Sequence, residues 1–197
     1  MVKYFTAKRL AFLSVFTALV LVMTMFVKFP NPAMGYTNLG DAFIFLGAMC
    51  FGPAFAMISG GIGSALADVL SGYAMYAPFT LVVKGAEGFL AGVVLHALLK
   101  AKCNRHAAAL LSAAVAACEM VAGYFLANAA LYGGFAAAAG GLLNDGIQGA
   151  IGVVAAYIFA LILANVKEFD KYAENPLSHA AKNENPRGKN DEDNPLK

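Results

Sequence analysis

Residues 76–99 read YAPFTLVVKGAEGFLAGVVLHALL, a run that is long and apolar enough to cross a bilayer yet carries Lys84 and Glu87 inside it. A membrane-spanning helix needs about 20 predominantly apolar residues, and a charged side chain at bilayer depth costs several kcal/mol, so it faces a bundle interior, a partner or a cavity. Similar apolar surroundings hold four more acids: Asp41, Asp68, Glu119 and Asp145. We expect the spans to surround something polar.

The composition is that of an integral membrane protein. The 197-residue chain is 60% hydrophobic, has a mean hydropathy of +0.65 and is only 13% charged, whereas soluble domains are about 45–50% apolar. The net charge of +2 indicates no particular partner, because the charges are sorted by position. Three scattered cysteines, Cys50, Cys103 and Cys118, make neither a disulfide framework nor a metal-ligand cluster.

Apolar runs predict an all-α membrane bundle of six helices, formed by residues 1–166 as one domain. The six segments cover residues 10–27, 41–57, 64–70, 76–99, 107–132 and 140–165. Phe29-Pro30-Asn31-Pro32 ends the first, residues 33–40 form a loop, and Gly52-Pro53 kinks or ends the second, because proline cannot donate a helical hydrogen bond. The third segment, after the glycine-rich residues 59–63, is short, and is either a short helix or a re-entrant segment.

Basic residues predict that both termini lie in the cytoplasm. With six crossings, two basic groups fall on the same side of the membrane as the tail: Lys3, Lys8 and Arg9, and Lys100, Lys102 and Arg105. This satisfies the tendency of basic residues to stay inside. After Val166 the chain turns polar, with six basic and seven acidic residues. Residues 167–197 are therefore expected to form a disordered cytoplasmic tail.

Two groups of polar residues stand out within the spans. Lys84 and Glu87, at i and i+3, share a helix face and form either a structural ion pair or part of a ligand site. Asn144, Asp145 and Gln148 lie within about 100° of one another around the last helix. They are either hydrogen-bonding contacts between helices or a site for a neutral heterocycle, because amides both donate and accept.

Three further acids have a structural and a functional interpretation. Glu119, in the middle of a span, is a functional candidate by default, or a protonated and merely hydrogen-bonded group. Asp41 follows Gly40 and is expected to cap its helix or complement the helix dipole. Asp68 is expected to cap the turn before Ser71-Gly72.

Small residues form a stripe along the first span. Ala7, Ala11, Ser14 and Ala18 are separated by steps of four, three and four, so they share one helix face. Small faces let helix backbones approach closely in membranes. The stripe packs either within the bundle or against a separate membrane partner, and spacing alone does not decide.

Enzyme activity is not expected. No Gly-x-x-x-x-Gly-Lys-Ser/Thr loop is present, so the chain lacks the usual phosphate-binding motif of ATPases. His96, His106 and His179 are scattered, without metal-ligand spacing. We expect no catalytic residues, no metal and no cofactor.

Three ordered motifs carry a family resemblance. They are GYTNLGDAFIFLG at residues 35–47, GGIGSALADVLSGY at residues 60–73 and YAPFTLVVKG at residues 76–85. Together they resemble the substrate-binding S components of energy-coupling factor (ECF) transporters, in the branch that includes riboflavin-type and pyridoxine/hydroxymethylpyrimidine-type proteins. The resemblance extends over about residues 8–165.

The resemblance implies a multi-pass plasma-membrane protein that captures a vitamin at the outer face. A separate transmembrane coupling subunit and two ATPase subunits would supply the energy, and the stripe Ala7, Ala11, Ser14 and Ala18 would meet the coupling subunit, with Ser14 departing from the usual alanine. The binding pocket would include Tyr36, Asn38, Lys84, Glu87, Glu119, Asn144, Asp145 and Gln148. Its polar character favours pyridoxine or hydroxymethylpyrimidine, with riboflavin next. The alternative is an autonomous secondary transporter or channel for a small polar solute.

Overall fold

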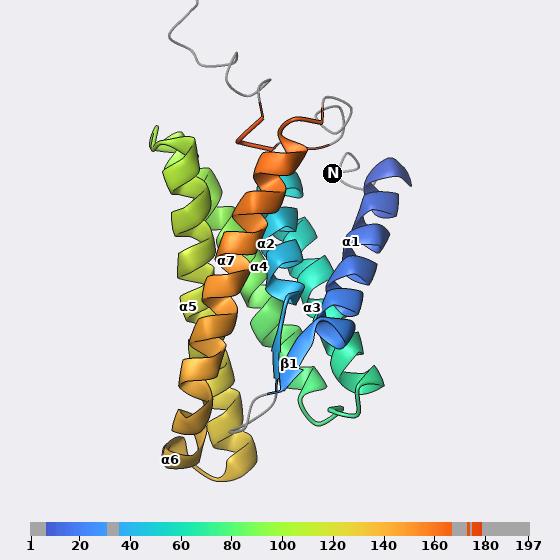
Figure 1. Ribbon diagram of the computed structural model, residues 1–197, viewed down its shortest axis with the longest axis vertical. Coiled ribbons are helices and arrows are strands. Elements are labelled where there is room, and N and C mark those ends of the chain that lie inside the picture. The colour runs from blue at the N-terminus through green and yellow to red at the C-terminus, as the bar shows by residue number, and fades with distance from the viewer. Residues whose placement is uncertain (1–6, 31–35, 167–172, 174, 179–197) are drawn as a thin grey trace, which may run out of the picture.

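The helices follow the apolar runs of the sequence and form an elongated bundle (Figure 1). The computed structural model describes residues 7–30, 36–166, 173 and 175–178. Its long helices are α1 (Ala7–Phe26), α2 (Gly40–Phe51), α3 (Pro53–Leu70), α4 (Ala77–Lys100), α5 (Arg105–Tyr132) and α7 (Leu142–Leu163). The short elements are β1 (Lys28–Pro30), β2 (Tyr36–Asn38), α6 (Phe135–Ala138) and the 3-10 turn η1 (Ala139–Gly141).

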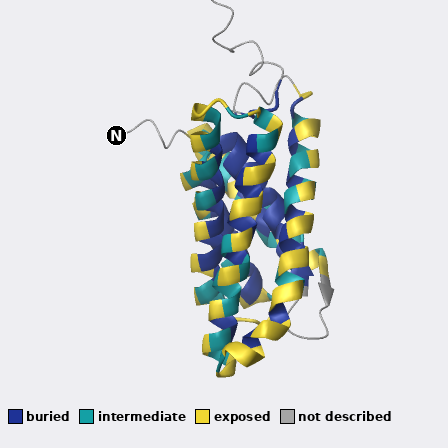
Figure 2. Cartoon of the chain, turned by 90° about the vertical axis from the view of Figure 1, so that its left-hand side faces the viewer, coloured by how far each residue is buried: buried dark blue, intermediate teal, exposed yellow. Residues whose placement is uncertain are grey.

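The prediction of an all-α membrane bundle is confirmed. Among the described residues, five stretches are long and apolar enough to cross a bilayer: α1, α3, α4, α5 and the stretch Phe135–Leu163 that contains α6 and α7. Large apolar side chains, among them Val82, Leu126 and Val154, lie exposed on the outward faces of the helices, which are yellow in Figure 2. Helices with apolar residues on both their inner and outer faces suit a lipid environment.

The second helix is shorter than predicted. It ends at Phe51, and α3 begins at Pro53 after Gly52, whose φ of +89° suits glycine. All of its 12 residues are buried, packed against α1, α3, α4 and α7. At about 1.5 Å per residue it is about 18 Å long, too short to span the bilayer core alone. Apart from Asp41, its side chains are apolar on every face because it forms the centre of the bundle.

The third helix, in turn, is longer than predicted. It runs for 18 residues through the glycine-rich stretch, so the short helix is the second and not the third. These glycines do not end the helix; they let its neighbours approach. A Cβ on Gly61 would lie 2.9 Å from the carbonyl oxygen of Leu81 in α4, and one on Gly63 would lie 2.7 Å from that of Thr17 in α1. Such close approach is the usual role of glycine between membrane helices.

A β-hairpin replaces part of the predicted loop between the first two helices. β1 pairs antiparallel with β2, with Lys28 opposite Asn38 and Pro30 opposite Tyr36. The hairpin lies beside the start of α7, which β2 contacts. The sequence analysis missed it because three-residue strands are too short to show a periodic pattern.

The bundle has two chemically different ends. The start of α1, the α4–α5 connection and the end of α7 lie together at the top of Figure 1, and the hairpin and α6 lie at the other end. We call these the basic end and the hairpin end. Of the described basic residues outside the bundle interior, the basic end holds Lys8, Arg9, Lys100, Lys102 and Arg105, and the hairpin end holds Lys28.

Part of the polar tail packs against the basic end. Ala173 and Leu177 are buried members of the core cluster, and Asn175 Nδ2 donates a hydrogen bond to the carbonyl oxygen of Ala160 at 2.8 Å. Pro176 and Ser178 are buried as well. The remainder of the segment that we expected to be disordered lies outside the described residues.

Gly92→Ala is expected to lower the free energy of unfolding by about 1–3 kcal/mol, the usual cost of overpacking. A Cβ on Gly92 would lie 2.5 Å from Pro53 Cα, where the start of α3 crosses α4. The matched control is Gly146→Ala in α7, where a Cβ meets nothing within 4 Å and alanine is the better helix former. Thermal unfolding of the detergent-solubilised protein measures both. Equal melting temperatures for the two variants would show that α3 and α4 do not pack this closely.

Candidate functional site

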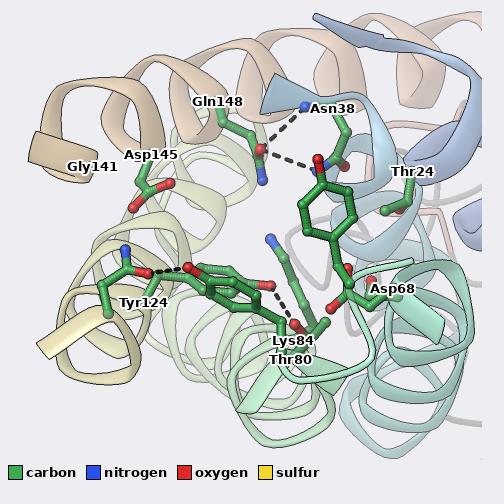
Figure 3. A pocket seen from close by; sticks show the side chains of 13 residues that line it. Thr24, Asn38, Asp68, Thr80, Lys84, Tyr124, Gly141, Asp145 and Gln148 are labelled. Carbon is green, nitrogen blue, oxygen red and sulfur yellow. Dashed lines mark hydrogen bonds between the residues drawn. The ribbon is translucent and has the colours of Figure 1, made fainter. Parts of the chain in front are cut away.

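A polar pocket lies toward the hairpin end of the bundle (Figure 3). Its cavity volume is about 70 Å³. Every long helix except α2 lines it, together with β2, the α3–α4 connection and η1. The lining residues are Thr24, Asn38, Ser64, Asp68, Tyr73, Tyr76, Thr80, Lys84, Tyr124, Asn128, Gly141, Asp145 and Gln148. A cavity with this many convergent polar groups in an apolar bundle is the default candidate for a ligand site.

Lys84 lies on the inner wall of the pocket and is held by two carboxylates. Its Nζ forms an ion pair with Asp41 of α2, and another at 2.9 Å with Glu87 one turn along α4. Lys84 is 2% exposed, and Asp41 and Glu87 are fully buried. Buried charges are tolerated only when they are paired, so the ammonium and its two carboxylates act as a unit.

Gln148 connects this unit to the hairpin. Its Nε2 donates to Asp41 Oδ2 at 3.0 Å, and its Oε1 accepts from both the backbone N and the Nδ2 of Asn38, each at 3.1 Å. Asn38 Oδ1 in turn accepts from the backbone N of Gly40, the first residue of α2. The amide of Gln148 thus uses its donor and its acceptor to join α7, β2 and α2.

Tyrosines form the side of the pocket contributed by α4 and α5. The hydroxyl of Tyr124 donates to Thr80 Oγ1 at 3.2 Å, and Lys84 Nζ lies 5.6 Å from the centroid of the Tyr124 ring, within range of a cation–π contact. The hydroxyl of Tyr76 donates to Asn128 Oδ1 at 2.7 Å and lies 3.0 Å from that of Tyr132. Burial, followed by the Tyr132 hydrogen bond, raises the pKa of Tyr76, so its hydroxyl stays protonated.

Three lining residues present polar atoms without a hydrogen-bond partner among the described residues. Thr24 Oγ1, Ser64 Oγ and Asp145 Oδ2 are all inaccessible to solvent and unpaired. Thr24 and Ser64 are 4% and 2% exposed. Because buried polar groups are nearly always satisfied, these unpaired atoms are candidates for hydrogen bonds to a ligand or to water.

Comparison with known proteins agrees with the fold and the pocket. Residues 4–165 match the family described as "ECF-type riboflavin transporter, S component". The chain belongs to this family. It is therefore a multi-pass membrane protein and a transporter subunit rather than an enzyme, and it works with an ECF module on a vitamin or a vitamin precursor.

Two curated proteins are similar to this chain over most of its length. The chain is 32% identical over 158 residues to the "Thiamine precursor transporter HmpT" of Lactococcus lactis subsp. cremoris (strain MG1363), a match that covers 79% of this chain and 87% of the relative. It is 40% identical over 136 residues to an "Uncharacterized protein in gap 3'region" of Pyrococcus woesei, which covers 68% of this chain and 87% of the relative.

The S component brings four of its sequence-predicted binding residues together at the pocket: Asn38, Lys84, Asp145 and Gln148. Glu87 lies behind Lys84 as its ion-pair partner. Asn144 Oδ1 instead accepts a hydrogen bond from Thr37 Oγ1 at 2.8 Å and so holds the hairpin. Glu119 is half-buried and does not line the pocket. The side chain of Tyr36 lies outside the described residues.

Several pocket residues were absent from the sequence prediction. Asp41 was expected to cap α2 or to complement its dipole. No side chain caps the helix, but Asp41 lies in its first turn, where a carboxylate complements the dipole, and it pairs with Lys84. Asp68, which was expected to cap a turn, is buried and lines the pocket. Thr24 and Ser64 carry no charge to signal them. The signal available in the sequence was a carboxylate inside an apolar helix. It marked Asp41 and Asp68 as unusual but did not reveal which residues they contact.

The small stripe of α1 faces outward. Ala7, Ala11, Ser14 and Ala18 are all exposed in this chain. Ser14 Oγ donates to the carbonyl oxygen of Leu10 at 3.0 Å, so its hydroxyl is satisfied within the helix. The stripe is thus exposed among the described residues of the S component.

Lys84→Met is expected to lower the free energy of unfolding by about 3–5 kcal/mol, because it leaves two buried carboxylates without their counter-ion. Adding Asp41→Asn and Glu87→Gln removes both charges and should restore most of the loss. The control is Lys100→Met, at the exposed end of α4, with an expected change of at most about 0.5 kcal/mol. Unfolding in detergent measures all three chains. A Lys84→Met chain as stable as the wild type would contradict the ion-pair assignment.

Proposed function

We propose that this S component captures a small water-soluble vitamin or precursor at the outer face of the plasma membrane and delivers it to an ATP-driven module. Pyridoxine and hydroxymethylpyrimidine are the favoured ligands and riboflavin is next. The observation that carries the proposal is a polar pocket at the hairpin end of a bundle whose basic residues gather at the opposite end. Basic ends stay in the cytoplasm, so the pocket faces outward and both termini lie inside.

The half of the bundle opposite the pocket supports the proposal that transport needs partner subunits. Between the pocket and the basic end, the described residues form an apolar cluster that includes Phe45, Phe55 and Leu95. A channel or an autonomous carrier needs a polar path or a moving repeat, and this cluster blocks such a path. In this proposal, a transmembrane coupling subunit and two ATPase subunits drive the conformational change that transport needs.

The exposed face of α1 is the proposed docking surface for the coupling subunit. Its stripe of Ala7, Ala11, Ser14 and Ala18 lets a partner helix approach to backbone distance. Helix α1 contributes only Thr24 to the pocket. A partner docked on α1 therefore leaves the pocket residues of α4, α5, α7 and the hairpin free to hold the ligand. Docking and capture then use different parts of the S component.

A panel of B vitamins and their precursors should give one strong ligand in a thermal-shift screen of the detergent-purified protein. A ligand that binds only the native state raises the melting temperature, by about 2.7 kcal/mol of stabilisation at 100 times the dissociation constant. Uptake of that ligand by cells should need the co-expressed ATPase module. Full-rate uptake without the module would reject the proposal in favour of an autonomous transporter.

Ala11→Leu and Ala18→Leu should spare ligand binding and abolish co-purification with the ATPase module, because a leucine on the stripe separates the two helix backbones. The control is Ala114→Leu, another exposed alanine, on α5, which should leave assembly intact. Binding is measured by titration calorimetry and assembly by affinity purification. Normal assembly of both stripe variants would show that the partner docks elsewhere.

A further inference from the structure

Glu119 lies near the midpoint of the 28-residue helix α5, outside the pocket. Its side chain is half-buried, and its Oε2 atom is inaccessible to solvent and has no hydrogen-bond partner among the described residues. An ionised carboxylate at bilayer depth is costly unless it is compensated. Glu119 therefore either faces a counter-ion or carries a proton.

Packing places Glu119 opposite Glu87 of α4. The two helices run antiparallel, because only residues 101–104 connect them. A Cβ on Gly123 of α5 would lie 2.8 Å from a methyl carbon of Val83 in α4, so these two residues are level with each other. Glu119 is four residues before Gly123. Glu87 is four residues after Val83. Each acid thus lies one turn, or about 6 Å, from that contact toward the basic end, and the two carboxyl groups interact electrostatically.

The carboxyl groups in this part of the bundle outnumber the ammonium groups. From α4, Glu87 and Lys84 are within electrostatic range of Glu119, and Lys84 already holds two carboxylates. Among the described residues, no other lysine or arginine lies between the two ends of the bundle. The other elements that pack against α5 add no cation: α6 and η1 hold no titratable residue, and those of α7 are Asp145 and Tyr157. An ionised Glu119 would therefore be a third carboxylate for a single ammonium.

Glu87 offers an acceptor for a proton held by Glu119. It is fully buried, and its Oε2 atom lies 2.9 Å from Lys84 Nζ, which stabilises its ionised form. Its Oε1 atom has no hydrogen-bond partner among the described residues, although buried polar atoms are nearly always satisfied. A protonated carboxyl supplies one O–H donor, and a hydrogen bond from an O–H to a carboxylate is one of the strong ones. A proton on Glu119 would satisfy both acids at once.

We propose that Glu119 is a proton-binding site: in the folded S component its carboxyl stays protonated at neutral pH and donates a hydrogen bond to Glu87. Through Glu87, this proton helps to hold the Lys84 ammonium at the wall of the pocket. Glu119 is thus a positioning residue that does not touch the ligand. The proposal goes beyond the proposed function, and it depends neither on the identity of the ligand nor on the partner subunits.

Glutamine keeps a donor at this position and cannot ionise, whereas leucine keeps the approximate size and has no donor. The test measures the unfolding equilibrium of the full-length protein in detergent, as a function of pH, for the wild type, Glu119→Gln and Glu119→Leu. Above the ordinary glutamate pKa of about 4.3, the native state would hold a proton that the unfolded chain has lost. The unfolding constant of the wild type should therefore rise with pH relative to that of Glu119→Gln, by up to about tenfold per pH unit. Glu119→Leu leaves Glu87 without its donor, so its unfolding constant should be about tenfold larger than that of Glu119→Gln.

The matched controls are Val115→Gln and Val115→Leu, at an exposed position one turn earlier on α5. They measure the intrinsic difference between the two side chains, and subtracting it isolates the contact with Glu87. A Glu119→Gln chain that is as unstable as Glu119→Leu, or that fails to fold, would overturn the proposal, because Glu119 would then need its charge. A wild-type unfolding constant that keeps a fixed ratio to that of Glu119→Gln at every pH would overturn the bound proton.

Discussion

The arrangement of the bundle depends on one buried ammonium, that of Lys84, between the carboxylates of Asp41 and Glu87. Separating the three would leave uncompensated charge in the interior, at a cost of about 3–5 kcal/mol. Since Asp41 belongs to α2 and the other two to α4, the ion pairs set the position of α2 along α4. Gln148 extends the same constraint to α7 and the hairpin, because its amide bonds Asp41 on one side and Asn38 on the other.

The two halves of the bundle on either side of Lys84 differ in side-chain size. Toward the basic end, glycine and alanine bring the helices together: a Cβ on Gly88 would lie 2.5 Å from the carbonyl oxygen of Ala56, and one on Gly149 would lie 2.9 Å from the Cβ of Ala117. Toward the hairpin end, tyrosines, amides and carboxyls occupy the equivalent positions. At this end too, a Cβ on Gly61 would lie 2.9 Å from the carbonyl oxygen of Leu81, so α3 and α4 stay in close contact while polar side chains line the pocket beside them.

Apolar run lengths were enough to predict the helices, because spanning a bilayer places a strict demand on length and hydropathy. Gly52-Pro53 was correctly identified as a break, but the glycines of α3 were misinterpreted, since glycine marks either a turn or a close helix contact and only the neighbouring helix decides which. The same limit applies to the site. A sequence shows that Asp41 is an acid in apolar surroundings, but its partner Lys84 is 43 residues away, and pairing over that distance is a property of the fold.

The cluster around Lys84 also bears on how a captured ligand could leave toward the cytoplasm. A path through the bundle would have to part Lys84 from its carboxylates and open the apolar contacts of Phe45 and Leu95 behind them. Ligand binding cannot supply that energy, because a ligand shifts a conformational equilibrium only by its difference in affinity between the two states. A tightly held ligand instead stabilises the closed pocket further. In the proposed function, release depends on a partner that contacts the S component outside the pocket, and the stripe of small residues on α1 is exposed for that contact.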